Sequence, residues 1–345
     1  MGLKEGMALI ELEHVRKVYR TTRRREGFLG TLRTLVRPEY VEIEALRGIS
    51  FRIEAGECVG YIGPNGAGKS TTIKLMTGIL VPTDGSVFIN GLVPWRYRRE
   101  NALQIGVVFG QRTQLYWDLP LIESFELLRR IYRVPASQYQ STRKELEDLL
   151  GLREFLTIPV RQLSLGQRMR GELAAALLHS PKILYLDEPT IGLDVLAKER
   201  ILEFIREVNQ RHGVTIVLTT HNLNEVERLC PRIILIDRGS ILYDGTVDGL
   251  KRRYAPWRTL VLRFHARIPD AFPEGVALIR REGDTVWLRF DRDRSPYELI
   301  EKIVASTPVQ NLSVEEPTLE EIIRDIYRSQ EEASERRWLR PLVFT

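Results

Sequence analysis

Residues Gly63-Pro64-Asn65-Gly66-Ala67-Gly68-Lys69-Ser70 follow the phosphate-binding pattern G-x-x-x-x-G-K-[ST]. The apolar run Cys58 to Ile62 before them predicts a short buried strand, and the run Thr71 to Met76 predicts the first turns of a helix. In such a turn successive backbone N–H groups point at one concavity, and the helix N-terminus adds positive potential. We therefore expect a bound nucleoside triphosphate, with Lys69 at its β- and γ-phosphates and Ser70 as a Mg²⁺ ligand.

The composition is that of an ordinary globular protein. The chain has 345 residues, enough for two domains, of which 43% are hydrophobic and 28% charged. No run approaches the length of a membrane span, and the first seven residues lack the layout of a signal peptide. The two cysteines, Cys58 and Cys230, sit among apolar residues, where small buried side chains are expected rather than a disulfide or metal site. We expect a reduced, cytoplasmic protein.

The positive charge is unevenly distributed. The formal net charge is +5, and arginines and one lysine crowd the stretch from Arg16 to Arg37. Such a stretch can face nucleic acid, anionic lipid head groups or water, and a solvated face is the default expectation.

Strand-like and helix-like segments alternate from about residue 8 to residue 245, which predicts an α/β core with a largely parallel sheet. Early strands are expected at Ala8 to Val18 and Ala45 to Ile53. Four further apolar runs predict buried strands: 107–109, 183–186, 215–218 and 233–236. Between Pro120 and His179 the pattern becomes helical, with Leu121, Phe125, Leu128 and Ile131 on one face.

After about Arg253 the pattern changes to short strands and two amphipathic helices, 296–303 and 319–327, which predicts a small α+β domain. We thus expect a first domain at 1–250, with an insertion at about 21–43 and a helical subdomain at about 112–180. The second domain is expected at 251–345.

Polar residues follow several of the predicted strands. Asp187 and Glu188 end an apolar strand, so in a doubly wound sheet they would lie beside the phosphate loop. Asp187 can hold Mg²⁺ through water, and Glu188 can take a proton from an attacking water. Gln111 follows another strand, where it could complete the Mg²⁺ shell and sense the γ-phosphate. His221 follows a third strand and could donate to developing negative charge, although a lone histidine there is more often structural.

Two further segments are less specific. Leu163-Ser164-Leu165-Gly166-Gln167 precedes a predicted helix from about Arg168 to Leu178, so Ser164 fits an N-cap and the following N–H groups form a second anion site. Ordinary capping is the better explanation of that segment when it is taken alone. Asp194, after Ile191-Gly192-Leu193, also fits a plain turn.

Together these motifs resemble the ATP-binding cassette (ABC) ATPases, the motor subunits of ABC transporters. Residues 8 to 245 are similar to that family in motif order and spacing: Walker A (63–70), Q-loop (Gln111), signature (163–167), Walker B (186–189), D-loop (192–194) and switch histidine (His221). The resemblance implies a P-loop NTPase fold, with a RecA-like core, an antiparallel β subdomain and a helical subdomain. It also implies that two cassettes sandwich two ATP molecules head to tail, so that Ser164, Gly166 and Gln167 of one chain meet the γ-phosphate held by Lys69 of the other.

The resemblance assigns roles residue by residue. Tyr19 looks like the aromatic residue that stacks on adenine, although a core or surface tyrosine is the alternative. The catalytic set is Glu188, His221 and Gln111, and the metal set is Ser70, Gln111 and Asp187. The nucleotide-binding set is Tyr19, Gly63, Pro64, Asn65, Gly66, Ala67, Gly68, Lys69, Ser70, Thr71, Ser164, Gly166, Gln167 and Asp194.

Two features depart from the family pattern. Leu165 stands where the signature usually has its first glycine, so this loop must reach phosphate with ordinary backbone angles. We expect hydrolysis to survive, since Ser164 and Gly166 remain. About two dozen residues separate Tyr19 from Ala45, and within them Phe28, Leu32, Leu35 and Val36 share one helical face flanked by arginines. A similar insertion in polysaccharide exporters approaches the membrane subunit, while a loosely packed surface helix fits nearly as well.

The whole chain resembles cassettes of the ABC-2 export class, including drug- or viologen-efflux members. Pro317 to Ile322 match a Pro-Thr-Leu-Glu-Glu-Ile stretch of their C-terminal domain. We expect an ATP- and Mg²⁺-dependent ATPase that works as a homodimer on the inner face of the membrane. Its partners would be separate ABC-2 permease subunits that dock on residues 112 to 120. The alternatives are a polysaccharide or teichoic-acid exporter motor and a soluble cassette acting on nucleic acid, although no nucleic-acid partner is expected.

Overall fold

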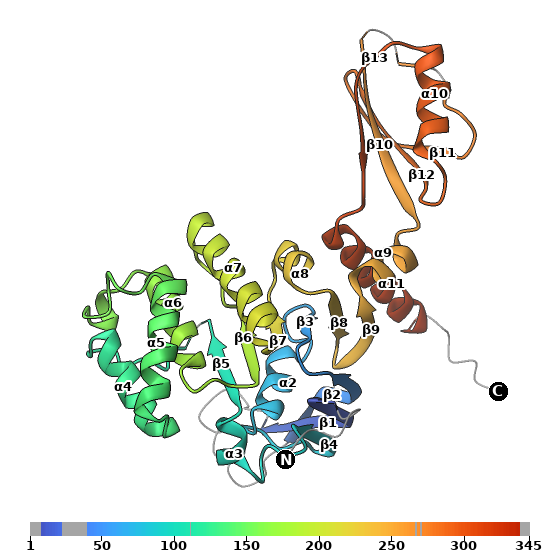
Figure 1. Cartoon of the computed structure of the whole chain (residues 1–345). Helices are drawn as coiled ribbons and strands as arrows, with labels where there is room; N and C mark the ends of the chain where they lie inside the picture. Colours follow the sequence, from blue (N-terminus) through green and yellow to red (C-terminus); the bar gives the residue numbers. More distant parts are fainter. Residues whose placement is uncertain (1–7, 23–39, 111, 266–267, 270, 339–345) are drawn as a thin grey trace, which may run out of the picture. The chain divides into compact units, whose positions relative to one another are not determined.

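The structure is a computed structural model that describes residues 8–22, 40–110, 112–265, 268–269 and 271–338. The chain divides into two compact units, Met1–Gly245 and Thr246–Thr345. Figure 1 labels the elements of each unit. The division assigns residues 246–250, which the sequence pattern places in the first domain, to the second unit.

The first unit is built on a six-stranded sheet of order β5-β6-β7-β3-β8-β9 (Figure 1). The first five strands in this order run parallel. Every residue of β3 and of β7 is buried, because helices cover both faces of a parallel sheet and its strands must be apolar throughout. The four predicted strands are confirmed, although Val107 and Phe109 of β5 are only partly buried. The strands are β3 (Cys58–Ile62), β5 (Ile105–Phe109), β6 (Ile183–Asp187), β7 (Thr215–Thr219), β8 (Arg232–Asp237) and β9 (Ser240–Thr246).

A second, antiparallel sheet of order β2-β1-β4 comprises β1 (Ile10–Thr22), β2 (Tyr40–Ile53) and β4 (Asp84–Ile89). The early strands are longer than the sequence pattern predicts, since β1 and β2 extend into both ends of the segment expected as an insertion. Arg16 and Arg20 pair across these strands with Glu44 and Glu42, so these two arginines lie on a solvated face beside acidic partners. The helix expected over Phe28 to Val36 lies outside the described residues.

Most helices of the first unit alternate with its strands, while α4, α5 and α6 follow one another between β5 and β6. The helices are α2 (Lys69–Met76), α3 (Arg98–Ala102), α4 (Leu121–Tyr132), α5 (Ala136–Leu150), α6 (Leu165–Leu177), α7 (Val195–His212) and α8 (Leu223–Leu229), with a 3₁₀ turn at Val160–Gln162. Helix α4 buries Leu121, Phe125 and Leu128 as its periodicity predicts. Ile131 is 59% exposed, so its assignment to that buried face is wrong. Helix α4 ends directly afterwards, with Arg133 in the left-handed conformation.

The second unit has a four-stranded antiparallel sheet of order β11-β12-β10-β13, with strands β10 (Trp257–Phe264), β11 (Val276–Glu282), β12 (Thr285–Asp291) and β13 (Val309–Glu315). Its core joins Leu260 and Leu262 of β10 and Leu288 of β12 to Leu299 and Ile303 of α10 (Pro296–Ser306). The unit also contains α9 (Val247–Tyr254) and α11 (Leu319–Trp338). An antiparallel sheet with segregated helices is the α+β arrangement that the sequence predicts.

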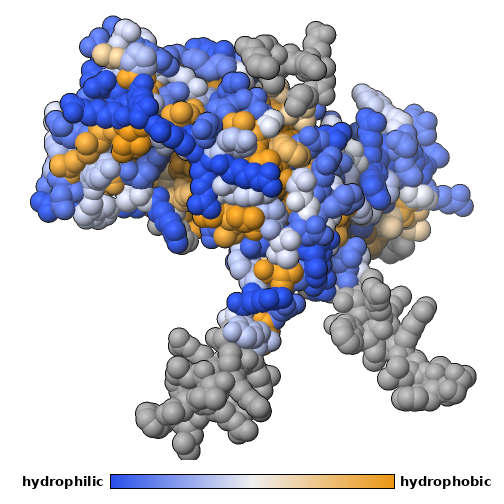
Figure 2. All heavy atoms as spheres, turned by 90° about the horizontal axis from the view of Figure 1, so that it is seen from below, coloured by the Kyte–Doolittle hydropathy of each residue, from blue (hydrophilic) through white to orange (hydrophobic). Residues whose placement is uncertain are grey.

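The surface carries apolar side chains in patches. Figure 2 shows one face of the molecule, on which such patches interrupt a mainly polar surface. In the first unit Tyr116 and Trp117 are nearly half exposed, and Val195 and Leu196 are each 74% exposed. Within the described residues, no helix combines the length and the apolar character needed to cross a membrane.

Candidate functional site

The glycine-rich loop lies between β3 and α2, as predicted. Gly68 has φ 114° and precedes Lys69, the first residue of α2. A Cβ at Gly63 would lie 2.3 Å from the carbonyl oxygen of Ile236, so only glycine fits beside β8 there. The Lys69 Nζ donates to the carbonyl oxygens of Gly63 and Pro64, at 2.6 and 3.1 Å. Burial lowers the pKa of Lys69, against the opposing effect of Glu188 and Asp187. The loop is thus a compact cationic turn that faces two carboxylates.

Asp187 and Glu188 lie at the carboxyl end of β6, beside β7. The Thr219 Oγ1 donates to Asp187 Oδ1 at 2.5 Å, which fixes that carboxylate at the end of the neighbouring strand. Glu188 Oε1 lies 3.2 Å from His221 Nε2, and the His221 backbone N–H donates to Glu188 Oε2 at 3.4 Å. The structure therefore brings three sequence-predicted residues together at one edge of the sheet.

Glu188 is held in an unusual state by its surroundings. Its φ is 58°, in the left-handed region that a non-glycine residue adopts only when its surroundings fix it there. Its backbone N–H donates to the Thr219 carbonyl at 3.0 Å, which ties this conformation to β7. Burial raises the pKa of the Glu188 carboxyl, while His221 and Lys69 lower it. A carboxylate with a raised pKa beside an imidazole is suited to accept a proton near neutral pH.

These groups line one pocket of about 510 Å³. Its lining includes Asn65, Gly66, Lys69, Ser70 and Thr71 from the loop, with Asp187, Glu188 and His221 opposite. Ser164, Gly166, Gln167 and Asp194 are not among the described residues that line it. The pocket therefore gathers one part of the predicted nucleotide-binding set and omits the other.

Ser164, Gly166, Gln167 and Asp194 form a second cluster in the same chain. Ser164 is the N-cap of α6: its Oγ accepts from the Gln167 N–H at 3.2 Å, and Gln167 Oε1 accepts from the Ser164 N–H at 2.9 Å. Leu165 is the first residue of α6, and its Cδ2 would lie 3.1 Å from a Cβ placed on Gly192. Asp194 caps α7 by accepting from the Ala197 N–H at 2.9 Å. The signature and the D-loop thus pack together, at two helix N-termini that offer free N–H groups.

Gln111 lies outside the described residues. At the adjacent Gly110, a Cβ would lie 2.3 Å from the Glu188 carbonyl oxygen, and the Gly110 N–H donates to the Asp187 carbonyl at 2.8 Å. The Tyr19 hydroxyl lies 3.4 Å from the Thr71 Oγ1, which places this ring beside the start of α2.

Sequence reasoning missed a buried carboxylate, Glu225 on α8, which is 1% exposed. It accepts from Thr190 Oγ1 at 2.8 Å and from Thr220 Oγ1 at 3.0 Å, and it pairs with Lys198 Nζ at 2.6 Å. Thr190 follows Glu188 by two residues, Thr220 precedes His221, and Lys198 follows Asp194 by four. One side chain thus joins the segments that carry three predicted site residues. A charged residue in an otherwise apolar stripe of a short helix was the available signal.

A second buried acid links the segment after Gln111 to the signature helix. Glu172 of α6 is 3% exposed, accepts from the hydroxyl of Thr113, and accepts from the Gln114 N–H at 3.2 Å. Burial raises the pKa of Glu172, and these hydrogen bonds oppose the rise. The segment predicted to dock a membrane partner is therefore anchored to the helix that the signature begins.

Comparison with known proteins places this site in a family. Residues 46–191 match the family described as ABC transporter. The chain is 32% identical over 315 residues to the methionine import ATP-binding protein MetN 2 of Enterococcus faecalis, covering 88% of this chain and 86% of that protein. It is 30% identical over 301 residues to the linearmycin resistance ATP-binding protein LnrL of Bacillus subtilis, covering 84% and 96%.

A solved structure agrees with the fold. The dimeric ATP-binding cassette MJ0796, in a post-hydrolysis state with bound ADP and Pi, superposes with a TM-score of 0.57 at 29% identity, covering 69% of this chain and 98% of that one. The chain therefore belongs to the ATP-binding subunits of ABC transporters and is an ATPase with the P-loop NTPase fold. The expected fold class and enzyme class are confirmed.

Members of this family bind ATP, generally with Mg²⁺. The residues present fit both. The loop N–H groups and Lys69 suit phosphate, while the Ser70 hydroxyl and the Asp187 carboxylate are the hard oxygen donors that Mg²⁺ prefers. Within the described part of the chain, no three His, Cys, Asp or Glu side chains group as a metal site.

Proposed function

We propose that this subunit hydrolyses ATP as a head-to-tail homodimer and drives export through separate membrane subunits of the ABC-2 type, at the inner face of the membrane. The observation that carries the export assignment is the match to LnrL, a resistance ATP-binding protein, over 96% of that protein's length. The match is long enough to reach into the second unit of this chain, where the stretch Pro317 to Ile322 includes the start of α11 at Leu319.

The division of the predicted nucleotide-binding set supports a homodimer. The pocket holds Lys69, Glu188 and His221, whereas Ser164, Gly166 and Gln167 lie outside it. Ile191, Val195 and Leu196, which flank Asp194, are 42%, 74% and 74% exposed. An exposed apolar patch beside an anion-binding helix N-terminus is suited to contact a second copy that holds a phosphate.

Within each site we assign the following roles. Lys69 and the loop N–H groups bind and orient the phosphates, and Ser70 and Asp187 would hold Mg²⁺, which supplies charge neutralisation when bound. Glu188 accepts the proton of the attacking water, and His221 orients the Glu188 carboxylate and donates to the γ-phosphate oxygens. We assign Gln111 to the same site from its position after β5, and Tyr19 to the adenine ring.

The exposed side chains of Tyr116 and Trp117 support a docking surface for the membrane subunit. Trp117 lies beneath Arg168 of α6, with the guanidinium 5.6 Å from the ring centroid. Glu172 of the same helix accepts hydrogen bonds from Thr113 and Gln114. A membrane subunit that displaced this surface would therefore also displace α6, the helix that begins at the signature. Trp117→Glu is expected to abolish co-purification with the membrane subunits and to preserve ATP binding, while Tyr97→Glu serves as the exposed control.

Import is the second candidate, because MetN 2 matches over 86% of its length. A cell lacking this chain distinguishes the two. Export predicts that the cells accumulate a cytotoxic compound and become sensitive to it, with unchanged uptake of labelled methionine. Reduced methionine uptake with unchanged compound sensitivity would establish import and overturn the export assignment.

A further inference from the structure

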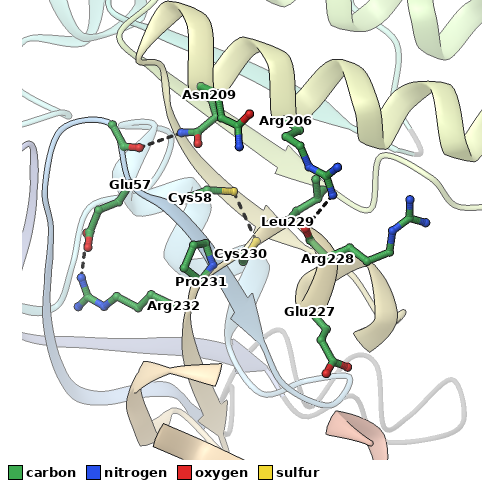
Figure 3. A pocket seen from close by; sticks show the side chains of 12 residues that line it. Glu57, Cys58, Arg206, Asn209, Glu227, Arg228, Leu229, Cys230, Pro231 and Arg232 are labelled. Atoms are coloured by element: carbon green, nitrogen blue, oxygen red, sulfur yellow. Dashed lines mark hydrogen bonds and ion pairs between the residues drawn. The ribbon is translucent and has the colours of Figure 1, made fainter. Parts of the chain in front are cut away.

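A second pocket of the first unit lies at the opposite ends of the strands from the nucleotide site. It has a volume of about 340 Å³ and shares no lining residue with the nucleotide pocket. Both cysteines of the chain line it: Cys58 is the first residue of β3, and Cys230 caps the C-terminus of α8. Figure 3 shows the two thiols pointing toward each other.

The two thiols are in contact. Their Sγ atoms lie 3.5 Å apart, with one thiol donating a hydrogen bond to the other. The elements that carry them are tightly packed, since a Cβ on Gly60 of β3 would lie 2.5 Å from Val226 Cγ1 and 3.6 Å from Cys230 Cβ. A disulfide has an S–S bond of about 2.0 Å, so the sulfurs must approach by about 1.5 Å, which a change of side-chain rotamer can supply.

The pocket gives small molecules access to one thiol more readily than to the other. Cys58 is 6% exposed and Cys230 is 1% exposed, so Cys58 is the thiol that a small molecule in the pocket meets first. The hydrogen bond with Cys58 and burial raise the pKa of the Cys230 thiol, which makes it the poorer first nucleophile. Cys58 is therefore expected to react first and Cys230 second.

The charged lining indicates which small molecules enter. Arg206, Arg228 and Arg232 contribute three guanidinium groups, and Glu57 and Glu227 contribute two carboxylates (Figure 3). Arg232 pairs with Glu57 at 2.9 Å, and Arg206 donates to the Arg228 carbonyl at 3.0 Å, so the rim is held in place. Arg228 also pairs with Glu199 at 2.6 Å and Arg232 with Asp244 at 2.8 Å, so the rim presents paired charges of both signs. Such a rim suits a zwitterionic molecule, which carries both an ammonium group and a carboxylate.

We propose that Cys58 and Cys230 form a reversible thiol–disulfide site that reacts with small zwitterionic disulfides such as cystine or oxidised glutathione. The Cys58 thiolate attacks one sulfur of the small disulfide, forming a mixed disulfide and releasing one small thiol. The Cys230 thiolate then attacks Cys58 Sγ, which forms the internal bond and releases the second small thiol. The protein loses two electrons and two protons, and the small disulfide gains both, as two thiols.

The internal bond would join β3, which leads into the phosphate loop, to the end of the helix that follows His221. It would connect residues 172 positions apart in the sequence and so constrain the unfolded chain strongly. We therefore expect a higher midpoint of thermal unfolding in the oxidised protein, reversed by a dithiol reductant.

The test incubates the native full-length chain with oxidised glutathione and reads intact mass and free thiols. The wild type is expected to lose both thiols with no glutathione adduct. Cys230→Ser is expected to accumulate one glutathione on Cys58, because no second thiol resolves the mixed disulfide. Cys58→Ser is expected to react at least tenfold more slowly, and ATP binding reports that each variant is folded.

Three results would overturn the proposal or its class of ligand. Both thiols could remain free in the native wild type and react only in denaturant, which would establish an inert packing pair. A wild type that retained a stable mixed disulfide would exclude Cys230 as the resolving thiol. Reaction with the neutral 2-hydroxyethyl disulfide is expected to be several-fold slower than with cystine, and an equal or faster rate would overturn the proposed class of ligand.

Discussion

Glu188 Oε1 lies 3.2 Å from His221 Nε2, across the ends of two neighbouring parallel strands. The contact joins a carboxylate whose backbone is fixed in the left-handed region to an imidazole carried on the next loop. Because β6 and β7 pair in register up to Asp187 and Thr219, the sheet itself sets the distance between the two groups. The geometry of the hydrolytic site therefore depends on the register of these strands as well as on the residues at their ends.

Glu188→Gln should abolish turnover and retain ATP binding. The amide keeps the shape of the side chain and loses the ability to accept a proton, so kcat is expected to fall about 100-fold or more. The Kd for ATP is expected to change less than threefold. Steady-state phosphate release and equilibrium nucleotide binding measure the two quantities.

The matched control is Glu199→Gln on α7, an exposed acid that pairs with Arg228 at 2.6 Å. Its turnover should remain within about twofold of wild type, as is usual for an exposed ion pair. Wild-type turnover in Glu188→Gln would remove Glu188 from the role of base. ATP should also lengthen the lifetime of the Glu188→Gln dimer, which size-exclusion chromatography can follow.

Lys69→Ala should weaken nucleotide binding by tenfold or more, because the ammonium is the principal cation facing the predicted phosphate position. The variant also removes two donors from the carbonyl oxygens of Gly63 and Pro64, so its thermal midpoint must be compared with that of wild type. Lys182→Ala, at an exposed position before β6, is the control. An unchanged Kd for ATP in Lys69→Ala would refute the role of the loop.

Glu225→Ala should impair both stability and turnover, since it removes the shared partner of Thr190, Thr220 and Lys198. Breaking a buried ion pair by removing one partner typically costs about 3–5 kcal/mol. Glu225→Gln keeps an acceptor for the two hydroxyls, so its stability should be closer to wild type.

A positioning role makes a distinct kinetic prediction for Glu225→Gln. The kcat should fall about tenfold while the KM for ATP stays within twofold, because Glu225 is not among the described residues that line the nucleotide pocket. Lys198→Met provides the second arm of a double-mutant cycle, and additive effects of the two substitutions on kcat would show that the pair does not position His221.

The sequence predicts the parallel sheet, the phosphate loop and the carboxylates because each depends on a local pattern. The run Cys58 to Ile62 is uniformly apolar. The loop Gly63 to Ser70, which connects that strand to the following helix, matches a pattern known to adopt one conformation. Strand ends then bring Asp187, Glu188 and His221 together through topology alone, since parallel strands align their carboxyl ends.

Features that depend on tertiary packing could not be predicted in this way. Ile131 has the helical spacing of a buried residue, but α4 ends one residue later and leaves it exposed. Glu225 looks like a surface residue in sequence, and only the fold shows that Thr190, 35 residues away along the chain, and Lys198 both contact its carboxylate. The contact between Cys58 and Cys230 likewise arises because α8 packs against β3 at Gly60.

His179 should make the stability of the first unit depend on pH. Its ring stacks on Tyr132 with centroids 4.0 Å apart, and its Nε2 lies 3.0 Å from the Ile105 carbonyl oxygen. Burial lowers the pKa of His179 to about 4, from an ordinary value of 6.5. The folded protein thus keeps the ring neutral where the unfolded chain protonates it. The stability that this neutral ring allows is fully present above pH 6.5 and is lost as the pH falls toward 4.

The unfolding free energy should decrease by at most about 1.4 kcal/mol per pH unit in this window. Denaturant titrations of His179→Gln, with His212→Gln as the control for an exposed histidine paired with Glu145 at 3.3 Å, measure the contribution. His179→Gln should flatten the slope between pH 6.5 and 4 relative to both other proteins, and an identical slope in all three would show that His179 does not titrate on unfolding.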